Sequence, residues 1–394
     1  MHWTVFALAG ITALAAIAPG PDYPEPKLSY SDIDAILAKH GPLQYGADAG
    51  ILETDRARAL VAIDRHIAHE GPLSDALAAF YRGRIDKALD EIERVPPPDE
   101  GVMIWKMYSS GFVLKAKGIC FSVDVVEGPV QSELATPEQM NARTEPMYAG
   151  GGRRVHQVKL YWTPEQRRRF ARLVDAHFVT HRHYDHASFT LIGELLAAGK
   201  TVVAPSDLKE LYVKAGVAGA EDIVLMDFSQ PNTVAGMQVL VFPGFQDPYR
   251  IEEVDGERRW VWNENPPMNN VYVFRAGGLS IMHNGDCRGY DQEFYPWLVG
   301  LMHTEWEPDV CLLIEYFRNA RKTVESLYDP LIIPCHELEL GHVRIDDAGE
   351  MQLHVSGYTH RLHGYAERIR EGKAAVMTWG EALLLRSGGP PTKE

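Results

Sequence analysis

The sequence predicts an α/β protein, in which a layered α/β domain over residues 101–385 follows an N-terminal helical extension. Two observations support this class. Short apolar strand patterns alternate with helical patterns after Gly101, which is typical of layered α/β domains. Before Pro96 the patterns are helical only. The length of 394 residues is enough to bury a core of this size.

The composition is globular and acidic. The chain has 39 Lys and Arg against 54 Asp and Glu, a net charge of −15 at pH 7, and 45% hydrophobic residues. This balance excludes intrinsic disorder as the main state. An acidic surface repels phosphate backbones, so we expect no nucleic-acid partner. The basic run Arg167–Arg169 is expected to form one solvated turn of a helix.

The N-terminus carries the one long apolar stretch, residues 4–18. About fifteen apolar residues are short for a membrane span, so we expect none in the mature chain. The stretch ends like a signal-peptide cleavage site, although the usual positive flank is missing. Residues 1–20 are therefore predicted to be a signal peptide, with an uncleaved anchor or a misassigned start as alternatives. A signal would export the protein to the periplasm or the medium; without one it stays in the cytoplasm.

Residues 21–30 are Pro-rich and predict an extended linker. Residues 31–98 then predict a helical accessory or cap region. Ser31 is expected to cap its first helix, which Gly41 stops. Two apolar stripes at helical spacing follow, formed by Leu60, Ile63 and Ile67 and by Leu77, Phe80, Tyr81, Ile85, Leu89 and Ile92. The region could shape a pocket, cover the active-site face or form the dimer contact of a homo-oligomer.

The first strands of the layered α/β domain are expected in VMIWKMY, GFVLKA and ICFSVD, which begin at Val102, Gly111 and Ile119. Residues 127–160 are Pro- and Gly-rich and predict a long loop, either a lid or a surface insertion. Thr163, Pro164 and Gln166 form a capping signature for a helix that ends near Val174.

A buried strand, AHFVT, precedes His181, and a helix over about 188–198 stops at Gly199. Later strands are expected in TVVAP, MQVLVF, NVYVFR, LSIMH, VCLLIEY and LIIPC.

The segment that carries chemistry is Thr180-His181-Arg182-His183-Tyr184-Asp185-His186, directly after that strand. Residues two apart in an extended chain project to the same side. His181 and His183 can therefore bind one ion, while the following turn brings Asp185 and His186 to a second. A His-rich surface loop is the alternative reading.

The pattern HxHxDH at a strand-to-helix junction is characteristic of the metallo-β-lactamase superfamily, and residues 101–385 resemble that family. The resemblance extends to LSIMHNGDCRG, which supplies Asp286, and to LIIPCHELELGH, which supplies His336. It implies an αββα sandwich. The ligands that it implies are His181 and His183 for the first metal, Asp185, His186 and His336 for the second, and Asp286 for both.

The same resemblance implies two divalent ions, Zn first and Mn or Fe otherwise, in a dinuclear centre. Such ions lower the pKa of a bridging water toward about 7 and so supply hydroxide at neutral pH. Asp185 is the catalytic residue that orients the water or passes a proton to the leaving group. The implied activity is hydrolysis of a small-molecule ester, lactone or phosphodiester, closer to the lactonase and phosphodiesterase branches than to true β-lactamases.

One position departs from the family pattern. The third His of the first metal is expected after Pro-Gly, but here the chain reads Pro243-Gly244-Phe245-Gln246-Asp247. Phe245 cannot bind a metal, whereas Gln246 or Asp247 could through oxygen. The first site is then weakened, favours a harder ion or is completed by water; loss of the site is the further alternative.

Several other residues have two readings. Asp124 is expected to support the site by hydrogen bonds. His283 and His342 are either substrate-facing or supporting, or else structural histidines. Cys287 follows Asp286 and could reach a metal, although strand neighbours usually point apart. The four cysteines suit buried positions, and a disulfide stays open if the protein is exported: Cys120, Cys287, Cys311 and Cys335.

Two other function classes compete with the hydrolase. Some relatives hold a di-iron redox centre, but these typically carry Glu where His183 stands. A non-catalytic metal- or ligand-binding protein on the same fold is favoured by the missing His and opposed by the other ligands. The sequence has no GxSxG motif that would supply a serine nucleophile.

Overall fold

The computed structural model describes residues 27–44, 50–70, 74–128, 153–154, 162–183, 185–228, 230–245, 249–254, 257–262, 268–287, 301–314, 321, 324–325, 328–336, 343–345, 351–353 and 357–387. The predicted signal segment and most of the expected loop 127–160 lie outside these residues. Among the described helices, none has both the length and the apolar character that crossing a membrane requires.

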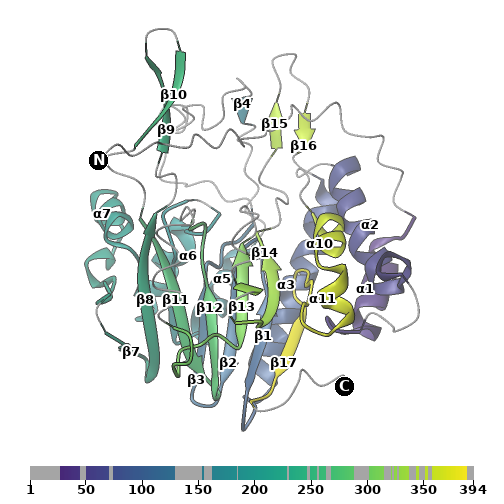
Figure 1. Cartoon of the computed structure of the whole chain (residues 1–394), viewed down its shortest axis with the longest axis horizontal. Helices are drawn as coiled ribbons and strands as arrows, with labels where there is room; N and C mark the ends of the chain where they lie inside the picture. The colour runs from purple at the N-terminus through teal and green to yellow at the C-terminus, as the bar shows by residue number, and fades with distance from the viewer. Residues whose placement is uncertain are drawn as a thin grey trace, which may run out of the picture.

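Two six-stranded sheets lie face to face (Figure 1). The first has the order β17-β1-β2-β3-β5-β6, with strands Ala382–Leu385, Val102–Lys106, Phe112–Ala116, Ile119–Val123, Ala176–Phe178 and Thr201–Val203. The second has the order β14-β13-β12-β11-β8-β7, with strands Leu331–Cys335, Val310–Ile314, Leu279–His283, Met268–Ala276, Met237–Phe245 and Asn232–Val234. Each sheet has parallel pairs at one side and antiparallel pairs at the other.

The core between the sheets follows the two-residue period of strands. In β2, Phe112 and Leu114 point into the inter-sheet core, whereas Val113 packs on the outer face with the helices. The inner core is dominated by aromatic and branched side chains, including Phe121, Phe178, Tyr272, Phe274, Ile281, Leu312 and Ile333. Burying such side chains against each other is what holds the two sheets together.

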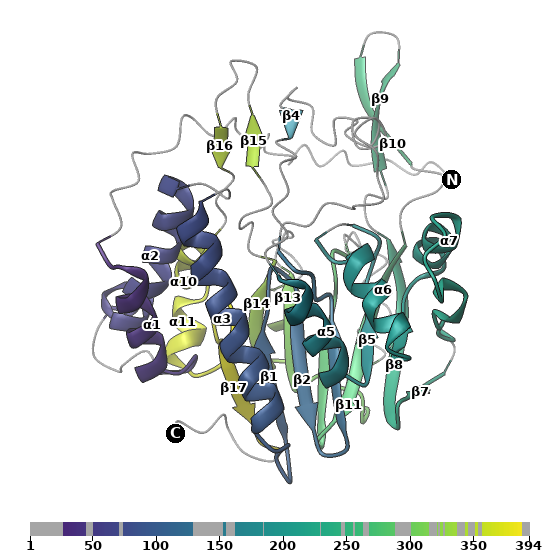
Figure 2. The ribbon, with the colours of Figure 1, turned by 180° about the vertical axis from the view of Figure 1, so that it is seen from behind.

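Helices cover the outer face of the first sheet: α3 (Asp75–Arg94), α5 (Pro164–Leu173) and α6 (Phe189–Ala197) lie across it (Figure 2). Helices α10 (Tyr358–Gly364) and α11 (Ala366–Arg370) lie at the edge of the sandwich beside β17 and β14. The predicted α/β class is confirmed, and the arrangement is an αββα sandwich with helices added at the N-terminus.

The N-terminal helices are α1 (Tyr30–Lys39), α2 (Asp55–Glu70) and the long α3, with the short 3-10 turn η1 (Ile51–Glu53) before α2. Buried polar contacts tie them to the C-terminal part of the chain. Arg56 pairs with Glu381, and Arg84 Nε donates to the carbonyl of Trp379 across 2.8 Å. The apolar side chains of these helices share one core with the outer face of the first sheet. The domain boundary expected near residue 98 stays a prediction.

Two local expectations were wrong. Ser31 does not cap the first helix; Ser29, two residues earlier, does, because Ser29 and Asp32 form a reciprocal capping box. The run Arg167–Arg169 is a helix turn but is not fully solvated: Arg167 is buried, and Arg169 lies 2.6 Å from both Asp90 and Glu93 of α3. The capping box of Thr163 and Gln166 at α5 is confirmed.

Further elements complete the chain. Helix α7 (Ser206–Lys214) and the 3-10 turn η2 (Ala220–Asp222) follow β6. A hairpin of β9 (Tyr249–Val254) and β10 (Glu257–Trp262) projects from the sandwich between β8 and β11 in sequence (Figure 1). A small sheet joins β4 (Arg153–Arg154), β15 (Val343–Ile345) and β16 (Met351–Leu353). All four cysteines are buried, as their apolar surroundings in the sequence predicted.

Candidate metal centre

Three strand ends meet at one edge of the sandwich. The chain leaves β5 through Val179 and Thr180 into the HxHxDH loop, and the isolated bridge between His181 and Asn269 ties the start of that loop to β11 of the other sheet. Asp286 comes three residues after β12, and His336 directly after β14. Residues that lie up to 155 positions apart in the printed sequence are thereby brought together.

The predicted ligand residues form two groups of three. His181, His183 and Asp286 form the first, and Asp185, His186 and His336 form the second; within each group the ligand atoms lie within 4.8 Å of one another. Five of the six side chains are buried, and His183 is partly exposed. Their role as ligands stays a prediction, but the spacing is what two ions would require.

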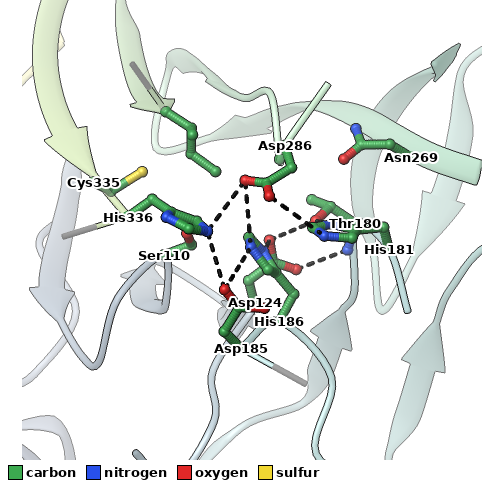
Figure 3. Close-up of polar contacts among 12 residues, drawn as sticks. Ser110, Asp124, Thr180, His181, Asp185, His186, Asn269, Asp286, Cys335 and His336 are labelled. Atoms are coloured by element: carbon green, nitrogen blue, oxygen red, sulfur yellow. Dashed lines mark hydrogen bonds and ion pairs between the residues drawn. The ribbon is translucent and has the colours of Figure 1, made fainter. Parts of the chain in front are cut away.

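Asp286 lies between the two groups (Figure 3). Its Oδ2 is 3.8 Å from His181 Nε2, and its Oδ1 is 3.5 Å from His186 Nε2 and 3.3 Å from His336 Nε2. Asp185 Oδ2 lies 3.1 Å from His336 Nε2. Because its two oxygens face different groups, Asp286 is placed to bridge two ions, which is the role that the resemblance implies.

The histidines have the orientation of metal ligands. His181 and His186 are completely buried, yet among the described residues their Nε2 atoms have no hydrogen-bond partner. Their other ring nitrogens are held, with His181 Nδ1 3.0 Å from Thr180 Oγ1 and His186 Nδ1 2.7 Å from Asp124 Oδ2. A buried nitrogen without a partner is costly, and a divalent cation would satisfy both. The residues present therefore fit two divalent ions.

Asp124 organises the back of the site. It is buried, and besides His186 it accepts hydrogen bonds from the Thr180 backbone N–H at 2.7 Å and from Thr180 Oγ1 at 2.6 Å. Its backbone has φ 48°, in the left-handed region. The carboxylate thus fixes both the strand extension that leads to His181 and the ring of His186, as expected of a support.

The site concentrates strained backbone. Ser109, Asp124 and His336 all have positive φ, at 50°, 48° and 62°. The backbone N–H of His336 donates to the carbonyl of Ser109 across 3.2 Å. Non-glycine residues in this region cost free energy and persist only where neighbours hold them, which is common at functional sites.

The charges of the protein itself prepare the site for cations. Burial, together with the neighbouring His186, holds the pKa of His181 well below its ordinary value. Burial alone would raise the pKa of Asp286, but His336 and His186 hold it well below its ordinary value. Burial alone would lower the pKa of His186, but Asp124 and Asp286 raise it well above its ordinary value. A neutral His181 and an ionised Asp286 are the forms that bind metal, whereas His186 would release a proton on binding.

The remaining candidate residues differ in where the structure places them. His283 is structural, because its Nε2 lies 3.0 Å from the carbonyl of Ser110 and its Nδ1 accepts from Gly285 N–H at 3.0 Å. Cys287 packs against Gly244 of β8, where an added side chain would collide with its sulfur. His342, Gln246 and Asp247 lie outside the described residues.

Sequence reasoning missed several residues around the site. Asn269 bridges to His181, Ser109 accepts from His336, and Arg361 donates to the carbonyls of Cys335 and His336. The Pro-Cys-His run at the end of β14 was a local signal for His336 itself. No local signal pointed to Ser109 or Arg361, because both act through contacts between distant segments.

Comparison with protein-family models finds no match for this chain, and comparison with curated proteins finds none either. Similar solved structures do exist. Igni18, a metallo hydrolase from the archaeon Ignicoccus hospitalis, is 13% identical with a TM-score of 0.42, over 72% of this chain and 98% of its own. The metallo-β-lactamase fold protein YhfI from Bacillus subtilis is 11% identical with a TM-score of 0.40, over 73% of this chain and 100% of its own.

CmlA, a diiron β-hydroxylase from Streptomyces venezuelae, is 13% identical with a TM-score of 0.41, over 74% of this chain and 55% of its own. At such identities any likeness concerns the fold. The chain itself has two facing sheets, the HxHxDH loop after β5, and Asp286 and His336 after β12 and β14. It has the metallo-β-lactamase type of αββα fold.

Proposed function

We propose that the protein is a metal-dependent hydrolase that cleaves an ester, lactone or phosphodiester bond of a small molecule. The observation that carries this proposal is the pair of three-residue ligand groups with Asp286 between them. Two divalent ions bound there, with Zn the first candidate, would make hydroxide available at neutral pH and polarise the oxygen of the scissile group.

Each side chain has a task in this proposal. His181, His183 and Asp286 would hold one ion, and Asp185, His186 and His336 with Asp286 the other. Asp185 is the candidate for proton transfer to the leaving group, since a carboxylate in the site can act as a general acid or base. Its Oδ2 lies 3.1 Å from His336 Nε2 inside the second group. His183 is the one partly exposed member, so the substrate would approach on its side of the centre.

The first alternative is a di-iron redox enzyme. CmlA, which shares the fold, is a diiron β-hydroxylase. The ligand set of this chain favours hydrolysis, because His183 occupies the position where such redox relatives typically carry Glu. The second alternative, a non-catalytic binding protein, is disfavoured by the close grouping of all six predicted ligands.

The test measures metal content and hydrolysis together. Protein purified without added metal would be analysed for Zn, Mn and Fe, and assayed with an aryl ester, a lactone and a phosphodiester. We expect close to two ions per chain, loss of one in His183→Ala and of the other in His336→Ala, and loss of both with all activity in Asp286→Ala. His360→Ala, which changes an exposed residue of α10, is the matched control and should keep both ions.

Other outcomes would select an alternative. Two iron ions with oxygen consumption and no hydrolysis would support the redox enzyme. A wild-type protein that binds no metal even after reconstitution would favour the binding protein, and full activity in Asp286→Ala would exclude the metal-dependent mechanism.

A further inference from the structure

His336 has a backbone that needs support. It is the first residue after β14, it is not glycine, and its φ of 62° lies in the left-handed region. That conformation is unfavourable for a residue with a side chain unless surrounding contacts enforce it. In this conformation its Nε2 lies 3.1 Å from Asp185 and 3.3 Å from Asp286, so the strained turn is what brings the ring to the other ligands.

Both peptide groups of His336 are held from outside its own strand. Its N–H donates to the carbonyl of Ser109 across 3.2 Å, and Lys106 Nζ donates to the same carbonyl. Its C=O accepts from Arg361 Nη2 at 3.2 Å. The same nitrogen of Arg361 donates to the carbonyl of Cys335 at 2.9 Å. The guanidinium therefore fastens two successive carbonyls at the point where the chain turns out of the sheet.

We infer that Arg361 is a positioning residue for His336. Its side chain is buried, so both hydrogen bonds are shielded from water and are worth more than surface contacts. A charged donor to a carbonyl makes a stronger hydrogen bond than a neutral one. The hydrogen bonds from Arg361 reach the carbonyls of Cys335 and His336, so Arg361 acts through the backbone of His336. This inference rests on the proposed function, because it assigns His336 to a metal.

The N-terminal helical extension holds Arg361 in turn. Arg361 lies on α10, and Asp64 of α2 binds the first turn of that helix. Asp64 Oδ1 accepts from Tyr358 N–H at 3.0 Å, while its Oδ2 accepts from Thr359 N–H at 2.7 Å and Thr359 Oγ1 at 2.6 Å. Any side chain at Gly357 would collide with this carboxylate. A continuous path of hydrogen bonds and helix contacts thus runs from α2 through α10 to the candidate ligand.

This path assigns a role to the helical extension. It need not reach the metal centre itself, because it orients the helix whose arginine supports the centre. The extension is then required for the second ligand group, formed by Asp185, His186 and His336, and not for the first.

The test compares two buried arginines of the C-terminal helices. Arg361→Met keeps an unbranched side chain in place of the aliphatic part of the arginine and removes the guanidinium donors. Arg368→Met is the matched control, because Arg368 is also buried and donates to Asp329 at 2.8 Å and to the carbonyl of Pro330 at 2.8 Å, at the opposite end of β14. Zn²⁺ affinity is measured by competition with a chromogenic chelator, and Co²⁺ absorption spectra report the geometry of each bound ion.

We expect Arg361→Met to lower the affinity for one of the two Zn²⁺ ions about 10- to 100-fold, as the removal of an outer-shell partner does. The weakened ion should be the one lost in His336→Ala, and its Co²⁺ spectrum should change. The other ion should bind as in the wild type. Arg368→Met should bind both ions with wild-type affinity even where it lowers stability, so a general loss of stability would not imitate the result.

Two further variants keep the inference falsifiable if Arg361→Met does not fold. Arg361→Lys keeps the charge and one donor nitrogen, and should lower the affinity for the same ion by a smaller factor. Asp64→Asn removes the charge that holds α10 and should also lower the affinity for this ion. Wild-type affinity for both ions in the variants that fold would overturn the positioning role and leave the hydrolase proposal standing. A wild-type protein without metal affinity would overturn the proposed function itself.

Discussion

His186 Nδ1 lies 2.7 Å from Asp124 Oδ2, and both side chains are completely buried. Asp124 comes directly after β3, whereas His186 belongs to the loop after β5, and these two strands are parallel neighbours in the first sheet. Their contact therefore joins two strand ends beneath the candidate metal centre. It orients the ring so that Nε2 faces Asp286 at 3.5 Å.

Asp124→Asn should lower the affinity of the second ligand group for its ion about 10- to 100-fold, because the ring of His186 loses its charged partner. Asparagine suits the φ of 48° at this position, so the backbone should not be disturbed. Zn²⁺ competition measures the effect. Asp175→Asn is the control, since Asp175 also accepts a backbone hydrogen bond, from Cys120 at 2.8 Å, but precedes β5 at the other end. Equal affinity in Asp124→Asn and wild type would refute the supporting role.

The ligand that takes the place of the missing third His of the first metal is predicted to be Gln246 or Asp247. Gly244 of β8 pairs with Asn269, and Asn269 bridges to His181, so β8 runs toward the first group as it ends at Phe245. A double change of Gln246 and Asp247 to alanine should remove one ion per chain, as counted by elemental analysis.

Gln238→Ala is the control for this experiment, because Gln238 is exposed at the far end of the same strand. Two ions retained in the double variant would mean that water or another side chain completes the first group.

The buried pair of Arg56 and Glu381 should make the helical extension unfold together with the sandwich. Their side chains are 0% and 4% exposed, and Arg56 Nη2 also donates to the carbonyl of Val376 at 2.7 Å. Removing one partner leaves an uncompensated buried charge, so Arg56→Met should lower the free energy of unfolding by about 3–5 kcal/mol.

Urea denaturation measures this effect, with one probe that reports on the helical extension and one that reports on the sheets. Arg58→Met, which removes an exposed pair with Asp55, should change the free energy of unfolding by no more than about 0.5 kcal/mol. Separate transitions for the helices and for the sheets would contradict the coupling and would favour an independent accessory domain.

Acid should destabilise the fold through His177. Burial lowers the pKa of this histidine from 6.5 to about 4, and its Nδ1 lies 2.8 Å from Ser122 Oγ. Below pH 6.5 the unfolded chain takes up a proton that the folded protein refuses until about pH 4. Stability is therefore lost as the pH falls through this window, by up to about 3 kcal/mol from this group.

The measurement is the free energy of unfolding at several pH values between 7 and 4. His177→Asn, which can still contact Ser122, should show a shallower decline than the wild type across that range. A parallel decline in both proteins would show that other groups control the acid sensitivity.

Local sequence determined many of the helices and strands of this protein and four of its six candidate ligands. The strands LSIMH and LIIPC have the bounds that the apolar runs predicted, and the capping box at Thr163 starts α5 where expected. These features depend on residues that are close together in the sequence, so the sequence alone is enough to predict them. The same holds for the HxHxDH loop, whose four candidate ligands are separated by fewer than six positions. Even so, a capping choice between Ser29 and Ser31 needed the geometry of Asp32.

Tertiary structure decided how the centre is assembled and supported. Asp286 and His336 enter it only because β12 and β14 end at the edge where the β5 loop also lies. The family resemblance named them, but their register against His181 and Asp185 is a product of the two packed sheets. The roles of Arg361 and Ser109 could not be predicted from the sequence around them, because a backbone carbonyl accepts a hydrogen bond from any donor that the fold brings near. The packing of distant segments, which produces no regular residue spacing in the sequence, therefore determined which groups hold His336 in its strained conformation.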